Sequence, residues 1–253
     1  MDSLFSLNGN NVLVTGGTRG IGRAISKRFA RAGARVLAAY VRDIDAADGL
    51  AAEAEAEGLA IRVCRADVAS EKGVESLVTA VSEFDGPLST LVHCAATGVH
   101  RPLDELTLRH FDWTFGSNVR AFFELVRRLT PCFAPSASIV ALSSIGAVRA
   151  VPQYTLVGSS KGALEALARH MAVELAPRGI RVNVLSPGTI LTDAWNVLPD
   201  AERRLAAATV KSPLGRFATV DEVAAAAQFL CSNAAIGIIG HTLVVDGGFS
   251  IVE

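Results

Sequence analysis

Short runs of apolar residues alternate along the chain with longer segments that have the pattern of helices. Runs such as NVLVT and ASIVALS are apolar on both faces, as parallel strands buried in a sheet are. We expect the strands at Asn11–Thr15, Arg35–Ala39, Ala60–Arg65, Thr90–His93, Ser138–Ser143, Arg181–Leu185 and Thr242–Val245. We expect the helices at Ile21–Ala32, Ala46–Glu57, Glu71–Phe84, Leu108–Thr130, Tyr154–Leu175 and Asp221–Leu230.

This alternation predicts an α/β fold: a doubly wound parallel sheet of the Rossmann type with helices on both faces. The chain has 253 residues, half of them apolar, which suits a single catalytic domain spanning residues 1–253. One long insertion follows the sixth strand, and we expect a substrate lid at residues 189–213. Trp195 and Leu198 in this segment would either cap an acyl chain or pin the lid to the core.

The distribution of charge argues against several classes of partner. Basic residues are well mixed with acidic ones at a net charge of −1, so nothing indicates binding to nucleic acid or an anionic membrane. No apolar stretch is long enough to cross a bilayer, and the N-terminus does not resemble a signal peptide. The four cysteines have no metal-ligand or disulfide pattern. We therefore expect a soluble cytoplasmic protein with no metal site.

A glycine-rich segment, TGGTRGIG, joins the first expected strand to the first helix. Glycines at such a turn let backbone N–H groups approach a pyrophosphate, whose charge is favoured at a helix N-terminus. The alternative is that this segment only connects a strand to a helix and binds no ligand. We expect a dinucleotide to contact this loop through Gly16, Thr18, Arg19, Gly20, Ile21 and Gly22.

The end of the second strand bears on which dinucleotide binds. An acidic residue there would hold a ribose 2′-hydroxyl, but this strand is followed by Arg42, with no acid before Asp43. Arg19 and Arg42 together would clamp a 2′-phosphate, which favours NADPH. The alternative is a pair of solvated surface arginines.

Taken together, these features resemble the short-chain dehydrogenase/reductase family over essentially the whole chain. The resemblance rests on Thr15–Gly22, Asp67-Val68, Asn118, Pro187-Gly188 with Thr192, and the segment 244–248. It implies further cofactor contacts from Asp67, Val68, Cys94, Ala95, Ala96, Lys161, Pro187, Gly188, Ile190 and Thr192. The family's usual Asn-Asn-Ala-Gly after the fourth strand here reads His93-Cys94-Ala95-Ala96. His93 is expected to be a hydrogen-bonded structural residue rather than an acid–base catalyst.

A second departure concerns the catalytic tyrosine. The family's Tyr-x-x-x-Lys has become Tyr154-x6-Lys161, and Val157 occupies the usual tyrosine position. This pattern and its surroundings resemble the NADPH-dependent enoyl-acyl-carrier-protein reductases of bacteria. On a helix, separations of four and seven give nearly the same face, but the longer one moves the phenol about 4–5 Å toward the helix start.

That shift suits the reduction of an enoyl thioester, where hydride goes to Cβ while charge collects on an oxygen two bonds further along. The resemblance implies that Tyr154 donates to this oxygen and that Lys161 binds the nicotinamide ribose. Ser144 would supply an orienting hydrogen bond, while Asn118 would hold a water chain or simply mark a helix kink. The alternative is that Tyr154 is an ordinary residue at a helix start and Lys161 a solvated one, with no catalytic role.

Three functional hypotheses follow. The first is reduction of a trans-2-enoyl chain carried on acyl carrier protein or coenzyme A, in fatty-acid or related biosynthesis. The second is a 3-oxoacyl or other carbonyl reductase in which loop geometry returns Tyr154 to the usual place. The third is a non-catalytic NADP-binding module. The family resemblance further implies a homotetramer.

Overall fold

A computed structural model describes residues 3–190 and 212–252 of the chain. All seven expected strands are present in one sheet, in the order β3-β2-β1-β4-β5-β6-β7, and each neighbouring pair is parallel. The strands are β1 (Asn11–Thr15), β2 (Arg35–Tyr40), β3 (Ile61–Arg65), β4 (Leu88–His93), β5 (Phe133–Leu142), β6 (Arg181–Pro187) and β7 (Thr242–Val245). The predicted doubly wound parallel sheet is confirmed.

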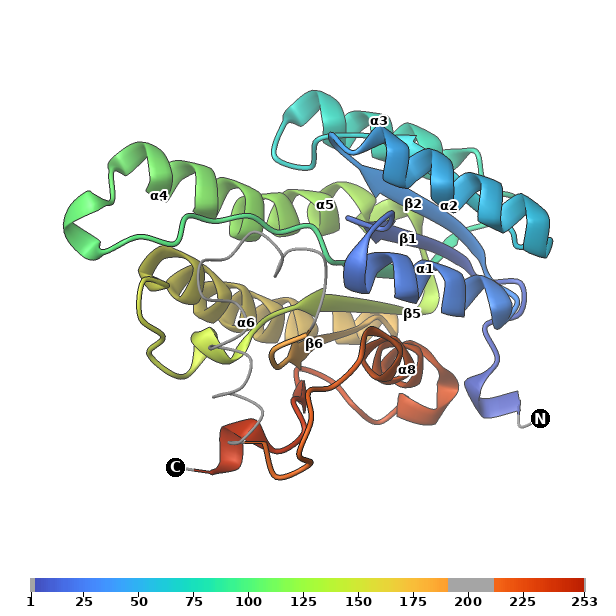
Figure 1. Ribbon diagram of the computed structural model, residues 1–253. Coiled ribbons are helices and arrows are strands. Elements are labelled where there is room, and N and C mark those ends of the chain that lie inside the picture. The colour runs from blue at the N-terminus through green and yellow to red at the C-terminus, as the bar shows by residue number, and fades with distance from the viewer. Residues whose placement is uncertain (1–2, 191–211, 253) are drawn as a thin grey trace.

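Two layers of helices cover the sheet. One layer contains α1 (Gly20–Arg31), α2 (Ile44–Glu57) and α8 (Val220–Cys231), and the other contains α3 (Glu71–Ser82), α4 (Leu108–Phe115), α5 (Ala121–Leu129) and α6 (Thr155–Leu175). Figure 1 shows the sheet between these layers. Alternate residues of a strand face opposite layers, so Val12 and Val14 pack with α1 and α8 while Leu13 packs with α3, α5 and α6.

The strand order reverses beside β1, whose neighbours are β2 on one side and β4 on the other. In open α/β sheets, ligands bind at the carboxyl ends of the strands next to such a switch point. The register pairs Thr15 with His93 at this end of β1 and β4. The glycine-rich loop and the altered Cys94-Ala95-Ala96 segment therefore emerge side by side.

The long helix expected at Leu108–Thr130 is interrupted. A π-helical turn, Gly116–Arg120, separates α4 from α5. Asn118 lies within this turn, fully buried, and its amide group bonds to the main chain of Thr97. π-turns accommodate one additional residue, and they are frequent at functional sites. Short 3₁₀ helices occupy Ser3–Phe5, Leu103–Glu105, Thr130–Cys132, Ile145–Ala147, Ala176–Arg178, Asn233–Ala235 and Phe249–Ile251.

Most of the expected lid lies outside the described residues, which omit 191–211. The expectations for Thr192, Trp195 and Leu198 therefore lie outside them too. Among the residues that the structure describes, no helix is both long and apolar enough to cross a membrane.

Candidate active site

The glycine-rich loop leaves no room for a side chain at Gly22 and little at Gly16. Gly16 has a φ of +64°, and a β-carbon at Gly22 would lie 2.0 Å from the Gly16 carbonyl oxygen. The close approach brings the first turn of α1 directly against the loop. Arg19, the N-cap residue of α1, makes no side-chain capping hydrogen bond. Uncapped N–H groups at a helix start suit an anion, so this cradle fits a dinucleotide pyrophosphate.

A buried pair of side chains ties the loop to the end of β4. The Thr15 hydroxyl lies 3.0 Å from Nδ1 of His93 and accepts a hydrogen bond from the Ala95 N–H at 3.2 Å. His93 is 1% exposed, and its ring lies 5.4 Å from that of Phe122. Burial, and secondarily the charge of Lys161, lower the pKa of His93 to about 3. A neutral, enclosed imidazole fits the structural role expected of His93.

Two further segments that carry expected contacts follow β4 and β6 at this end of the sheet. Cys94 and Ala95 are half-buried and Ala96 is exposed, all directly after β4. After β6, the Gly188 N–H donates to the Val245 carbonyl at 3.0 Å, and a β-carbon on Gly188 would lie 2.5 Å from Cβ of Asp246. Pro187 ends β6, and Ile190 is buried. These segments border the carboxyl ends of β4, β6 and β7.

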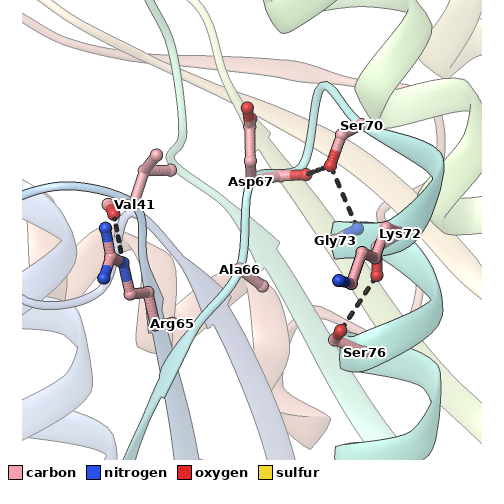
Figure 2. Close-up of a pocket in the computed structure, with 8 residues that line it drawn as sticks. All are labelled: Val41, Arg65, Ala66, Asp67, Ser70, Lys72, Gly73 and Ser76. Atoms are coloured by element: carbon pink, nitrogen blue, oxygen red, sulfur yellow. Dashed lines mark hydrogen bonds between the residues drawn. The ribbon is translucent and has the colours of Figure 1, made fainter.

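A pocket of about 300 Å³ lies at the expected adenosine end of the site. It is lined by Val41, Arg65, Ala66, Asp67, Ser70, Lys72, Gly73 and Ser76. Figure 2 shows Arg65 directed toward Val41, with Lys72 across the pocket. The Nε of Arg65 donates a hydrogen bond to the Val41 carbonyl at 3.1 Å. Asp67 is exposed and Val68 buried, as suits an adenine contact at the pocket's rim.

The two arginines expected at the 2′-phosphate are open to solvent. The Arg19 side chain is 76% exposed and lies 4.0 Å from Asp43, and Arg42 is exposed as well. Among the residues that the structure describes, neither arginine has a carboxylate partner closer than the 4.0 Å contact of Arg19 with Asp43.

Lys161, a candidate catalytic residue, is buried at the end of the sheet. It is 6% exposed, and its Nζ donates to the Leu142 carbonyl at 2.7 Å, at the end of β5. Burial lowers the pKa of Lys161 to about 8, against the opposing influence of Cys94 and Glu165. The ammonium group is therefore held at the strand ends, and it loses its proton at lower pH than an exposed lysine does.

Tyr154 and Ser144 are brought together, as the sequence predicts. Tyr154 is the N-cap residue of α6, and its hydroxyl lies 3.3 Å from the Ser144 Oγ. Ser144 follows β5 by two residues, before the 3₁₀ turn Ile145–Ala147. Two adjacent hydroxyl groups can both donate to one substrate oxygen.

Val157 fills the position of the family's usual tyrosine. It is 6% exposed, and a β-carbon at Gly98 would lie 2.1 Å from its Cγ2. The loop after β4 and the first turn of α6 are therefore in direct contact at Gly98.

The side-chain amide of Asn118 makes three hydrogen bonds. Its Oδ1 accepts from the Thr97 N–H and its Nδ2 donates to the Thr97 carbonyl, both at 2.9 Å, and Nδ2 also donates to the Ser160 hydroxyl at 2.9 Å. Asn118 therefore lies in the π-turn that interrupts the expected helix, and its role at a helix kink stays a prediction. The water chain stays a prediction.

Sequence reasoning missed several residues beside this group. Glu165 is buried, accepts from Ser143 at 2.6 Å, and lies one helical turn after Lys161, a spacing that could have identified it. His100 packs against Tyr154 and Gly146 lies beneath its ring, and no local pattern marks either residue. Within the described ranges, His, Cys, Asp and Glu side chains form no group of three or more that could hold a metal.

A parallel sheet with an anion cradle at its switch point, beside an enclosed lysine and paired hydroxyl groups, defines a dinucleotide-dependent oxidoreductase. A family model described as enoyl-(acyl carrier protein) reductase matches residues 16–250. The 1-cyclohexenylcarbonyl-CoA reductase of Streptomyces collinus is 37% identical over 242 residues, covering 95% of this chain and 86% of that protein. The D-threitol dehydrogenase of Mycolicibacterium smegmatis is 36% identical, covering 99% and 96%.

Solved structures of dehydrogenases and reductases are also similar to this chain. A dehydrogenase/reductase from Sinorhizobium meliloti superposes with a TM-score of 0.91 at 32% identity, covering 98% of this chain and 97% of that one. A protein from Beutenbergia cavernae, provisionally assigned as an NAD(P)-dependent gluconate 5-dehydrogenase and holding NADP at low occupancy, gives 0.88 at 32% identity, covering 97% and 98%. The chain belongs to the short-chain dehydrogenase/reductase family and is an NAD(P)-dependent oxidoreductase.

Proposed function

We propose that this protein reduces the C2=C3 double bond of a trans-2-enoyl thioester, carried on acyl carrier protein or coenzyme A, with NADPH. The observation that carries the proposal is the position of Tyr154. The tyrosine stands before the first turn of α6, while Val157 closes the usual position against Gly98. Three residues of helix correspond to about 4.5 Å of rise, so the phenol is set back from Lys161.

The chemistry explains why this displacement matters. In a ketone, the carbon that receives hydride also bears the oxygen that is protonated. In an enoyl thioester, hydride reaches Cβ and negative charge collects on the carbonyl oxygen, which is three bonds from Cβ and so two bonds further along than in a ketone. A hydroxyl that serves this oxygen must stand further from the point of hydride delivery, by about 2–3 Å. The N-cap position of Tyr154 is consistent with that need.

The chain's own residues then have distinct roles. Tyr154 donates a hydrogen bond and a proton to the thioester oxygen, and Ser144, 3.3 Å away, orients the phenol. Lys161 holds positive charge near the developing enolate. The glycine-rich loop and Arg19 and Arg42 hold the phosphates. When bound, the reduced nicotinamide supplies the hydride.

The similar proteins support this reaction without deciding it. The name of the Streptomyces relative describes reduction of a conjugated thioester, and the matching family model carries an enoyl reductase description. The D-threitol dehydrogenase acts on an alcohol, which keeps carbonyl reduction as a second candidate. The adjacent hydroxyl groups of Ser144 and Tyr154 would also suit a ketone oxygen.

The deciding experiment pairs two substrates. Purified protein is given NADPH with a trans-2-enoyl thioester or with the matching 3-oxo thioester, and the absorbance of the reduced nicotinamide is followed. We expect turnover of the enoyl substrate and its loss in Tyr154→Phe. Turnover of the 3-oxo substrate alone would establish the second candidate. Cofactor binding without turnover of either would point to a non-catalytic module.

The preference for NADPH is part of the proposal and has its own test. Arg42→Ala should raise the Kd for NADPH by about tenfold to a hundredfold, the range expected for a lost bond to a charged group. The Kd for NADH should not change. Arg62→Ala is a matched control, because Arg62 is exposed on β3 and paired with Glu83 at 2.6 Å. Equal effects on both cofactors would contradict a 2′-phosphate contact.

We further propose a homotetramer that acts in cytoplasmic acyl-chain biosynthesis. Large apolar side chains are exposed on the helices and the edge strand that would meet in such an assembly. They include Phe111 on α4, Phe123 on α5, Val173 on α6 and Val244 on β7. Sedimentation should give four times the mass of the chain. A monomeric mass would contradict the assembly.

A further inference from the structure

The ring of Tyr154 contacts two loops that come from different parts of the chain. One contact is with Gly146, in the turn after β5, and the other is with His100, in the loop after β4. Tyr154 precedes the first helical residue of α6 and makes no side-chain capping bond. Its neighbour Gln153 has a φ of +60°. A side chain at the edge of a helix is held less firmly than one within it, so contacts from elsewhere must fix the phenol.

The Gly146 side is a close backbone contact. A β-carbon at Gly146 would lie 2.5 Å from Cε1 of Tyr154 and 2.6 Å from Cδ1. Gly158, one turn into α6, is also adjacent, since its β-carbon would meet Cδ1 of Tyr154 at 3.4 Å and the Gly146 carbonyl oxygen at 2.7 Å. The ring therefore rests on a surface from which side chains are excluded.

The His100 side is an aromatic contact. The ring centroids of His100 and Tyr154 are 5.2 Å apart at an interplanar angle of 58°, within the range in which aromatic pairs attract one another. His100 itself is exposed, and Tyr154 is half-buried. A ring at this position adds a side-chain contact to the backbone contact that Gly146 makes with the phenol.

The loop that carries His100 is anchored at two points just before it. Asn118 holds both main-chain groups of Thr97 at 2.9 Å, and Gly98 packs directly on Val157. Both anchors are side chains in the interior of the protein. The π-turn and the valine at the vacated tyrosine position therefore both fix the place of His100.

We propose that His100 is a positioning residue, which holds the phenol of Tyr154 in the orientation that faces Ser144. It provides the lateral support that a tyrosine at position 157 would receive from the helix itself. The inference rests on the proposed role of Tyr154 as donor. It also gives Asn118 a role through the loop it anchors.

The kinetic test compares two substitutions. His100→Ala should lower kcat on the enoyl thioester by about tenfold, with little change in KM, because a donor misplaced by an ångström loses that much or more. His100→Phe keeps a planar ring and should restore kcat to within about threefold of the wild type. Arg101→Ala is the matched control, because Arg101 follows His100 in the loop, is exposed, and pairs with Glu105 at 3.8 Å. An unchanged kcat in His100→Ala would overturn the proposal.

A second readout needs neither cofactor nor substrate. The chain has two tyrosines, so fluorotyrosine in a Tyr40→Phe background gives one ¹⁹F resonance, from Tyr154. His100→Ala should shift this resonance, and His100→Phe should shift it less. An unmoved resonance would overturn the positioning role by itself. Failure of the wild-type protein to turn over any thioester would instead remove the proposed function, so the two failures are distinguishable.

Discussion

The two halves of the active site are built in different ways. The cofactor half is defined by backbone: Gly16 has a positive φ, and no β-carbon fits at Gly22. The donor half is defined by side chains that reach one another from separate loops, as Tyr154, Ser144 and His100 do. A backbone cradle tolerates almost no change, whereas a side-chain cluster can be rearranged by moving one residue along a helix. One fold can therefore keep its cofactor and alter its reaction.

Lys161 belongs to both halves. Its bond to the Leu142 carbonyl fixes it to the sheet, and it is close enough to His93 to lower the pKa of that ring further. The displacement of the tyrosine therefore leaves the lysine in place. The comparison predicts that changes in one half can leave the other intact.

The largest expected effect comes from Tyr154→Phe, which removes only the donor. Loss of a general acid costs about 10²- to 10⁴-fold in rate, so kcat/KM for the enoyl thioester should fall by that factor. The Kd for NADPH, measured by fluorescence titration, should stay the same, because the cofactor half is untouched. Tyr40→Phe is the control for loss of a phenol elsewhere. A parallel loss of cofactor binding would refute the separation of the two halves.

The same difference explains what the sequence could and could not predict. The glycine loop can be predicted from the sequence because its steric constraints act between residues only six apart, Gly16 and Gly22. The Tyr154–Lys161 pair can be predicted because both residues lie on one segment. The contact between His100 and Tyr154 joins residues 54 positions apart, and nothing local in the sequence records it.

The break in the long helix was missed for a similar reason. The apolar period continues through Gly116–Arg120, whereas the bonds that Asn118 makes from the π-turn go to Thr97 and Ser160, which are distant in the sequence. Periodicity reports which face is buried, but it does not report an extra residue within a turn.

Gly22→Ala should break the cofactor half. The added β-carbon would lie 2.0 Å from a backbone oxygen, so the loop must shift. Overpacking of this kind costs about 1–3 kcal/mol in the free energy of unfolding, measured by urea titration, and NADPH binding should weaken with it. Gly49→Ala is the contrasting control, because its β-carbon would meet nothing within 4 Å on α2 and should stabilise by up to about 1 kcal/mol. Equal stability of the two variants would contradict the tight packing.

Gly98→Ala should disturb the donor half alone. Its β-carbon would lie 2.1 Å from Cγ2 of Val157, so we expect a loss of stability of about 1–2 kcal/mol and a lower kcat, with the Kd for NADPH unchanged. Val157→Ala removes the opposing methyl groups. The double variant should therefore lose less stability than the sum of the two single variants' losses, by about 1 kcal/mol in a double-mutant cycle. Simple additivity would show that the loop and α6 are not in contact here.

The smallest expected effect links the halves through Lys161. Burial lowers the pKa of this lysine to about 8, so kcat/KM should decline as the pH rises through that value and the ammonium loses its proton. Glu165, buried one turn further along α6, raises the pKa of Lys161 by its charge. Glu165→Gln removes that charge, so the decline should move to lower pH. Glu174→Gln, at an exposed position of the same helix, should leave the profile unchanged. A shift to higher pH in Glu165→Gln would mean that the titrating group is not Lys161, because loss of a nearby negative charge cannot favour an ammonium.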